Sequence, residues 1–341
     1  MLSFLTLSKV ISMETIKIVV DAMGGDNAPV ETVKGAVDAA NEFGANIILV
    51  GIEDIIKEEL KKYTYPEDKI EVVHASEVIG TDEVPTLAFR RKKDSSMVVG
   101  LNLVKKGEAH AFVSAGSTGA LLTGATIIIG RIKGIERPAL GTCLPSVNGF
   151  TFLLDSGANV DCKPNYLVQF AKMASVYVEN VMGVKNPTVG LANIGVEEEK
   201  GNALVKEVHE LLKEEESINF VGNVEAREIP FNAADIIVCD GFVGNIILKF
   251  AEGLSVGLFK IIKSEITAGP YKLAAAMLKK PFKNVKKRFD SEEIGGAPFL
   301  GLKALVVKAH GSSKAKGIKN AIKQCTIFVE NDIVLKIEEK L

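Results

Sequence analysis

The chain has 341 residues, of which 47% are hydrophobic and 25% are charged, and its formal net charge at pH 7 is -2. These proportions are typical of a globular protein with a large core, and they exclude a disordered chain. A nearly neutral net charge argues against a surface devoted to nucleic acid, so we expect no nucleic-acid partner. No uninterrupted apolar run reaches the roughly 20 residues that span a bilayer, which predicts a cytoplasmic protein.

The first residues are expected to lie outside the fold. Residues 1–14 form a weakly apolar extension that lacks a basic start and a small-residue cleavage site, and Lys9 interrupts it, so it is not a signal peptide. Either Met1 or Met13 is the natural start. No repeat and no Pro/Ser-rich linker divides the remainder, and residues 15–341 are predicted to form a single α/β catalytic domain.

Short apolar runs alternate with stretches of helical periodicity along most of the chain. The expected strands are 16–20, 47–50, 70–74, 111–114, 150–154, 188–191, 218–221, 236–238 and 305–307. The clearest helices are 30–42, 54–62, 166–181, 203–216, 244–266 and 317–340. Strands that alternate with helices pair in parallel, and unbroken apolar strands are covered on both faces. The sequence therefore predicts a three-layer α/β/α sandwich with a mainly parallel sheet.

Glycine-rich loops follow four of the expected strands, at the edge where such folds bind ligands. They are 21–26, 114–119, 155–159 and 240–245. Glycine lets the backbone approach a ligand, and the N–H groups that open a following helix can hold a phosphate or an oxyanion. One such loop is more often a tight turn, but several at one sheet edge indicate a site. None has the P-loop or dinucleotide pattern, which predicts a small anion and no cofactor.

Two basic side chains near these loops have a structural and a functional interpretation. Lys200 follows a strand and opens a helix, where it is either a point charge for phosphate or a solvated partner of the acidic run 197–199. The spacing alone slightly favours the solvated lysine. His310, in a polar loop after a strand, is equally a donor to an anion or a structural loop residue.

Metal binding and covalent catalysis have little support in the sequence. The four histidines and four cysteines lack ligand spacing, and the cysteines are expected to be reduced and structural. Asp155, Asp161 and Asp240 are candidates for a magnesium site, but capping and loop-fixing roles are favoured for them. We therefore predict no metal.

A basic amphipathic segment is predicted over 267–290. Its lysines lie away from an apolar helical face, and Pro281 is expected to bend or break the helix. This pattern predicts contact with an anionic membrane or an acidic carrier protein, and the alternative is a surface helix packed on the core or on a second subunit. The residues expected in this contact are Leu278, Lys279, Lys280, Phe282, Lys283, Lys286 and Lys287.

Eight ordered motifs between about residue 16 and residue 329 closely resemble the phosphate acyltransferase family, the acyl carrier protein:phosphate transacylases. The motifs are 20–29 (VDAMGGDNAP), 90–97 (RRKKDSSM), 114–121 (SAGSTGAL), 130–139 (GRIKGIERPA), 155–161 (DSGANVD), 222–227 (GNVEAR), 240–245 (DGFVGN) and 308–313 (KAHGSS). The chain departs from the family pattern only mildly, with Ser117 where Asn is frequent and with its N-terminal extension.

The resemblance implies a homodimeric enzyme of phospholipid synthesis with a fold similar to isopropylmalate dehydrogenases and phosphotransacetylases. Such an enzyme converts a fatty acyl carrier protein thioester and inorganic phosphate into acyl phosphate, which a downstream acyltransferase uses. It acts in the cytoplasm, at most peripherally on the inner face of the membrane. The alternatives are a phosphotransacetylase-like enzyme that uses acyl-CoA and a dehydrogenase-like or purely acyl-binding protein.

The family's catalytic lysine and asparagine fall on Lys200 and Asn245, so the resemblance implies catalytic roles for both. Lys200 and backbone N–H groups are expected to hold phosphate beside the thioester, and Asn245 to donate to the developing oxyanion, without a covalent acyl-enzyme. The residues expected to bind phosphate or substrate are Asp21, Gly24, Gly25, Asp26, Ser114, Gly116, Ser117, Thr118, Gly119, Asp155, Asn159, Asn202, Asp240 and His310.

Overall fold

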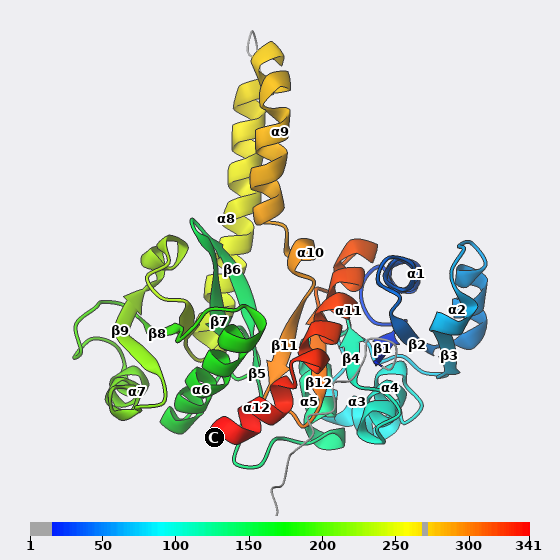
Figure 1. Cartoon of the computed structure of the whole chain (residues 1–341), viewed down its shortest axis with the longest axis horizontal. Coiled ribbons are helices and arrows are strands. Elements are labelled where there is room, and N and C mark those ends of the chain that lie inside the picture. Colours follow the sequence, from blue (N-terminus) through cyan, green and yellow to red (C-terminus); the bar gives the residue numbers. More distant parts are fainter. Residues whose placement is uncertain (1–15, 268–271) are drawn as a thin grey trace, which may run out of the picture.

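The computed structural model describes residues 16–267 and 272–341. The predicted extension 1–14 and both candidate start residues lie outside this range, as does the part 268–271 of the basic segment. Within it, two sheets stand side by side, helices cover their faces, and a long helical hairpin projects from the body (Figure 1).

The larger sheet has seven strands in the order β3-β2-β1-β4-β12-β11-β5. Its strands are β1 (Lys17–Asp21), β2 (Asn46–Gly51), β3 (Ile70–His74), β4 (Ala111–Ser114), β5 (Ala139–Leu140), β11 (Gly296–Leu300) and β12 (Leu305–Ala309). Strands β3, β2, β1, β4 and β12 pair in parallel, and only the pairings of β11 are antiparallel. The carboxyl ends of β1, β4 and β12 therefore meet at one edge.

The smaller sheet has five strands in the order β6-β7-β10-β8-β9. They are β6 (Thr142–Ser146), β7 (Gly149–Leu154), β8 (Thr188–Asn193), β9 (Asn219–Glu225) and β10 (Ile236–Val238). All pairs are parallel except the β6–β7 hairpin. The mainly parallel α/β architecture predicted from the sequence is confirmed, with the strands divided between two sheets that meet where β5 runs into β6.

Alternate strand residues point to opposite helical layers, as expected for strands buried on both faces. The helices are α1 (Val30–Phe43), α2 (Glu53–Leu60), α3 (Pro85–Arg91), α4 (Ser96–Lys105), α5 (Thr118–Ile128), α6 (Pro164–Val181), α7 (Ala203–Glu214), α8 (Gly241–Thr267), α9 (Lys272–Arg288), α10 (Ser291–Ile294), α11 (Ala315–Glu330) and α12 (Ile333–Lys340). In β1, Ile18 and Val20 pack in the core that holds α1 and α11, whereas Val19 packs with α3, α4 and α5.

One of the hydrophobic clusters spans both sheets. The ring of Tyr177 in α6 stacks on Phe152 of β7 with centroids 4.6 Å apart, and it meets Phe328 of α11 edge-on at 5.2 Å. On the opposite face of the smaller sheet, Leu153 packs in another cluster, against which the first turns of α8 lie. The N-terminal turns of α8 are thereby fixed to the smaller sheet.

Several elements were not anticipated, and one was wrongly joined. The sequence analysis missed the strands β5, β6 and β11 and the helices α3, α4, α5 and α10. The expected helix 317–340 is two helices, because Asp332 adopts a left-handed backbone conformation with φ of 48°. Pro281 was expected to bend or break its helix, yet α9 continues through it.

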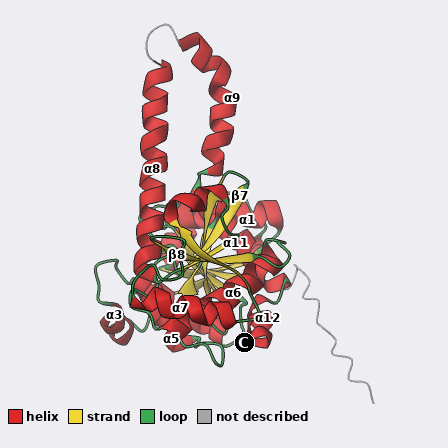
Figure 2. Cartoon of the chain, turned by 90° about the vertical axis from the view of Figure 1, so that its left-hand side faces the viewer, coloured by secondary structure: helices red, strands yellow, loops and turns green. Residues whose placement is uncertain are grey.

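Helices α8 and α9 form the projecting hairpin (Figure 2). By length and composition alone, α8 is long and apolar enough to cross a membrane: its best window has a mean hydropathy of 1.4, and 6% of that window is buried. The sequence contains no uninterrupted apolar run long enough to span a bilayer, because charged residues such as Lys249 and Glu252 interrupt α8. Averaged over a window, the hydropathy of α8 is nevertheless high enough.

Candidate active site

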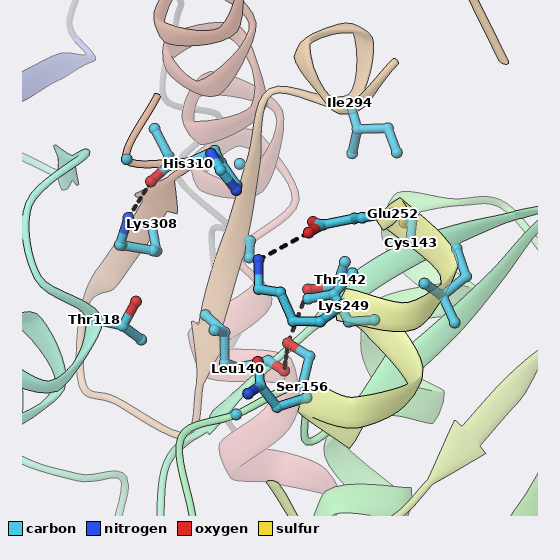
Figure 3. A pocket seen from close by; sticks show the side chains of 18 of the residues that line it. Thr118, Leu140, Thr142, Cys143, Ser156, Lys249, Glu252, Ile294, Lys308 and His310 are labelled. Carbon is cyan, nitrogen blue, oxygen red and sulfur yellow. Dashed lines mark hydrogen bonds and ion pairs between the residues drawn. The ribbon is translucent and has the colours of Figure 1, made fainter. Parts of the chain in front are cut away.

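A cavity of about 500 Å³ lies between the sheets at the root of the hairpin (Figure 3). The larger sheet contributes the loops after β4 and β12, and the smaller sheet contributes β6 and the loop after β7. The first turns of α8 and the connection from α9 to β11 complete the lining. The cavity therefore collects segments that are far apart in the sequence.

The loops after β1, β4 and β12 are tied together at the carboxyl edge of the larger sheet. The Ser114 hydroxyl donates to the Asp21 carboxylate at 2.7 Å and accepts the Gly116 N–H at 3.0 Å. The Asp26 N–H donates to the Gly311 carbonyl oxygen at 2.8 Å. The convergence predicted for the glycine loops 21–26 and 114–119 is thus observed, and the loop that carries His310 joins them.

Gly24 and Gly25 allow the closest of these approaches. A Cβ atom at Gly24 would lie 2.5 Å from Asp21 Oδ2, and Gly25 has a φ of +104°, a conformation that favours glycine. Asp21 lies beneath the loop and is 2% exposed. Its burial raises the pKa of its carboxyl, against the opposing effect of hydrogen bonds from Ser96 and Ser114. Gly24 and Asp21 therefore shape the loop rather than line the cavity.

The start of α5 supplies an anion-binding end. Gly116, Ser117 and Thr118 line the cavity, and the Ser117 side chain caps the helix by accepting the Ala120 N–H at 3.4 Å. The N–H groups of a first helical turn carry partial positive charge and bind phosphate or an oxyanion.

Lys308 is a buried cation beside this helix start, and it was not predicted from the sequence. Lys308 is 8% exposed, lines the cavity and donates from Nζ to the Ala115 carbonyl oxygen at 3.3 Å and to the Ala309 carbonyl. Burial lowers the pKa of its ammonium group to about 8, while Asp26 opposes the shift. The available signal was a single lysine within the otherwise apolar strand β12.

His310 also lines the cavity and points into it from the loop after β12 (Figure 3). Its Nδ1 lies 2.9 Å from the Ser312 hydroxyl. Burial lowers the pKa of His310, and the nearby Lys249 and Lys308 act in the same direction while Glu252 opposes them, which favours the neutral imidazole. The position of His310 fits both roles that the sequence left open, that of a structural loop residue and that of a hydrogen-bond donor to an anion.

The opposite wall is organised around Asp155, which is fully buried. Its carboxylate accepts backbone N–H bonds from Leu140, Gly157, Ala158 and Asn159 at 2.7 to 3.1 Å and a bond from the Asn159 amide at 2.8 Å. Asp155 and Asn159 therefore fix the loop, and Ser156 and Gly157 are the residues of it that reach the cavity.

Asn245 lies on the first turns of α8 and lines the cavity next to that loop. A Cβ atom at Gly157 would lie 3.4 Å from Asn245 Oδ1. Along the same helix, Lys249 and Glu252 also line the cavity and form an ion pair at 2.8 Å. Asn245 therefore lies in the wall of the cavity beside the loop after β7.

Two other predicted site residues are helix caps. Asp240 accepts the Val243 N–H at 2.9 Å at the start of α8, and Asn202 accepts the Val205 N–H at 2.9 Å at the start of α7. For Asp240 this agrees with the capping role that the sequence favoured over magnesium binding.

Lys200 lies in the exposed loop after β8 and is not among the residues that line the cavity. Its N–H donates to the Glu197 carbonyl oxygen at 3.1 Å, and its own carbonyl oxygen accepts from the Asn193 amide at 3.1 Å. Strand β10 separates β8 from β7 in the sheet. The structure thus brings Asn245 to the cavity and leaves Lys200 at a neighbouring position of the same sheet edge.

Cys143 lines the cavity but is poorly suited to act as a nucleophile. Burial raises the pKa of its thiol to about 12, so the thiolate is scarcely populated near neutral pH. Cys143 is therefore a poor candidate for a nucleophile in this cavity.

Comparisons with known proteins agree with this arrangement. The family model described as "Fatty acid synthesis protein" matches residues 16–336. The chain is 55% identical to a phosphate acyltransferase of Clostridium acetobutylicum over 326 residues, covering 95% of this chain and 98% of that protein. It is 52% identical to a phosphate acyltransferase of Alkaliphilus oremlandii over 325 residues, covering 95% of this chain and 97% of that protein.

The fold is similar to that of a phosphotransacetylase from Streptococcus pyogenes, with a TM-score of 0.63 at 19% identity over 94% of this chain and 96% of that one. This likeness confirms the predicted similarity to phosphotransacetylases at the level of the fold. The family model and the two relatives cover nearly the whole chain, and so the chain belongs to the phosphate acyltransferase family of fatty acid synthesis proteins.

Proposed function

We propose that the chain transfers a fatty acyl group from an acyl carrier protein thioester to inorganic phosphate, and that it forms acyl phosphate for phospholipid synthesis. The observation that carries this proposal is the position of Lys308 and the α5 start across one cavity from Asn245. A cation and free N–H groups suit phosphate, and an amide donor suits a carbonyl oxygen. The names of the relatives support the same reaction class.

In this mechanism Lys308 and the N–H groups at Ser117 and Thr118 hold phosphate. A phosphate oxygen forms a bond to the thioester carbonyl carbon, the C–S bond breaks, and the proton of hydrogen phosphate goes to the leaving thiolate. Asn245 donates to the carbonyl oxygen as it gains charge, a type of contact worth about 3 kcal/mol. Positioning of the two reactants supplies the rest of the rate enhancement.

Lys200 retains a role in the proposal because the resemblance assigns it one. Its loop lies at the same sheet edge as the loop of Asn245, so a movement of this loop toward the cavity would add a second cation to the phosphate. Lys308 lines the cavity without any movement, and so the contributions of the two lysines can be separated by mutation.

The hairpin is the proposed contact for the other partners. Its exposed apolar side chains include Phe250, which is 70% exposed, and Met277, which is 84% exposed, and its lysines at 279, 280, 283, 286 and 287 add positive charge. These features suit an anionic membrane on the cytoplasmic side, with a second subunit covering α8. A downstream acyltransferase consumes the acyl phosphate.

The direct test is formation of acyl phosphate from palmitoyl carrier protein and phosphate, trapped with hydroxylamine as the hydroxamate. A parallel reaction with palmitoyl-CoA separates the carrier-dependent enzyme from a CoA-dependent one. We expect phosphate-dependent product with the carrier substrate. The absence of product with either thioester would end the proposal, and product from CoA alone would change the substrate class.

A further inference from the structure

We infer that the apolar part of the cavity, between α8 and β6, is the binding site of the acyl chain, and that Ala251 and Ser255 determine how long a chain it accepts. This inference rests on the proposed function and adds the location and the specificity of the acyl group. We name this part of the cavity the apolar limb. It is lined by Leu144, Pro145, Leu248, Ala251, Phe289 and Ile294.

The apolar limb lies away from the anion-binding end. Figure 3 shows Cys143 and Ile294 on the side of the cavity opposite Lys308 and Thr118. In the proposed mechanism the thioester carbonyl lies beside Asn245, which lines the same cavity as both ends. A thioester carbonyl held there would therefore direct its chain into the limb while phosphate stays beside Lys308.

One face of α8 forms a wall of the limb. Leu248, Ala251 and Ser255 are three and four residues apart, so they share that face, and all three line the cavity. Val256, the next residue, is 57% exposed and does not line it. Ala251 and Ser255 are the smallest side chains of this wall, and larger side chains at these positions would narrow the limb.

The polar groups along the limb are already satisfied or neutral. The Ser255 hydroxyl donates to the Ala251 carbonyl oxygen at 2.7 Å within the helix, and the Cys143 thiol stays protonated and behaves as a small apolar group. Lys249 and Glu252, which also line the cavity, neutralise each other in an ion pair. A fatty chain would therefore bury its surface here without leaving a buried donor or acceptor unpaired.

Contacts at the hairpin root hold the residues on this side of the limb. The Arg288 guanidinium donates to the carbonyl oxygens of Ser146 and Val147 at 3.0 and 2.7 Å. The neighbouring Phe289 ring meets Phe259 of α8 edge-on at 5.7 Å. These contacts hold Phe289 in the wall of the cavity.

Ser255→Phe tests the inference because it fills the limb without touching Lys308, Asn245 or the α5 start. We expect the ratio of kcat/KM for palmitoyl carrier to kcat/KM for butyryl carrier to fall by roughly tenfold or more, since a filled limb excludes a long chain more strongly than a short one. Val256→Phe adds the same ring one residue along and is expected to keep the wild-type ratio. Thermal unfolding checks that both variants fold.

A folded Ser255→Phe enzyme with an unchanged chain-length ratio would overturn the inference, as would an equal fall in Val256→Phe, which would place the chain on the outer face of α8. If Ser255→Phe fails to fold, Ala251→Leu is judged by the same ratio.

A second measurement keeps the site and the reaction apart. Fluorescence titration with parinaric acid should show saturable binding to the wild type and to Val256→Phe, and binding at least about tenfold weaker to Ser255→Phe. If no thioester yields acyl phosphate but this pattern holds, the proposed function fails and the acyl site stands. If acyl phosphate forms but parinaric acid binds both variants equally, the site fails and the function stands.

Discussion

The Lys308 ammonium donates to the carbonyl oxygen of Ala115 at 3.3 Å, and this bond ties the end of β12 to the loop that opens α5. The same bond points the ammonium group at the place where the N–H groups of α5 begin. One hydrogen bond thus holds a positive charge next to the start of a helix. Glycine loops at a sheet edge provide N–H groups but no such charge.

Lys308→Met should raise the KM for phosphate. Loss of a charge-assisted hydrogen bond costs about 2 kcal/mol, which corresponds to roughly a thirtyfold increase in KM. The measurement is the phosphate dependence of acyl phosphate formation at saturating thioester. Lys303→Met removes an exposed lysine from the preceding turn and serves as the control. An unchanged KM in Lys308→Met would remove this residue from phosphate binding.

The activity should also depend on pH through Lys308. Burial lowers the pKa of its ammonium group to about 8, so the charge is present below that pH and lost above it. The KM for phosphate is therefore expected to rise above pH 8, by at most about tenfold per pH unit, and to level off near the roughly thirtyfold increase expected for Lys308→Met. Lys308→Arg should remove this rise, because arginine stays charged. A wild-type KM that is flat between pH 8 and pH 10 would contradict the assignment.

Between pH 8 and pH 10 the affinity for phosphate should fall, whereas the contribution of Lys308 to the free energy of unfolding should rise. The unfolded chain keeps the Lys308 proton up to a pKa near 10.5, whereas the folded chain loses it near 8. The unfolded state thus binds more protons between these values, and the contribution of Lys308 to the free energy of unfolding rises with pH. Urea unfolding of wild type and Lys308→Met at pH 8 and pH 10 measures this contribution as the difference between the two proteins.

Asn245→Ala should lower kcat by roughly a hundredfold to a thousandfold with little change in the KM for phosphate, as expected for a donor that acts mainly in the transition state. Asn245→Asp keeps the shape but removes the N–H donor and should fall as far. Asn165→Ala, at an exposed position near the start of α6, is the control. A rise in KM alone would assign Asn245 to ground-state binding.

Lys200→Ala tests the role that the resemblance implies against the position that the structure gives. We expect turnover to fall sharply while the KM for phosphate changes less than in Lys308→Met, because Lys200 must move toward the cavity to act. Lys206→Ala on α7 removes a neighbouring exposed lysine and should have no effect. A near-normal rate in Lys200→Ala would leave Lys308 as the cation of the mechanism.

The convergence of the glycine loops was predictable because it follows from parallel pairing, which local sequence patterns reveal. β1, β4 and β12 were all located within a residue or two, and their loops meet as expected. The role of Lys308 was not predictable, since its burial depends on packing between β12 and the loop after β4. Strand periodicity alone gives no indication that a lysine at this position faces a cavity.

The elements that were missed have a physical explanation as well. Helices α4 and α5 are strongly apolar and partly covered by neighbouring helices, so they lack the polar face that marks an amphipathic helix. β5 has only two residues, and β11 contains a proline and two small residues that weaken its strand pattern. The division into two sheets follows from these short antiparallel strands.

Helix α8 is continuous from the cavity wall to the tip of the described hairpin, over 27 residues. At 1.5 Å per residue, the distance from Asn245 to Thr267 is roughly 33 Å, and the helix behaves as a stiff lever over that length. Any body that tilts the outer end must also turn the inner end, where Asn245 lines the cavity. A force on the hairpin is therefore transmitted along one rigid helix to the wall of the cavity.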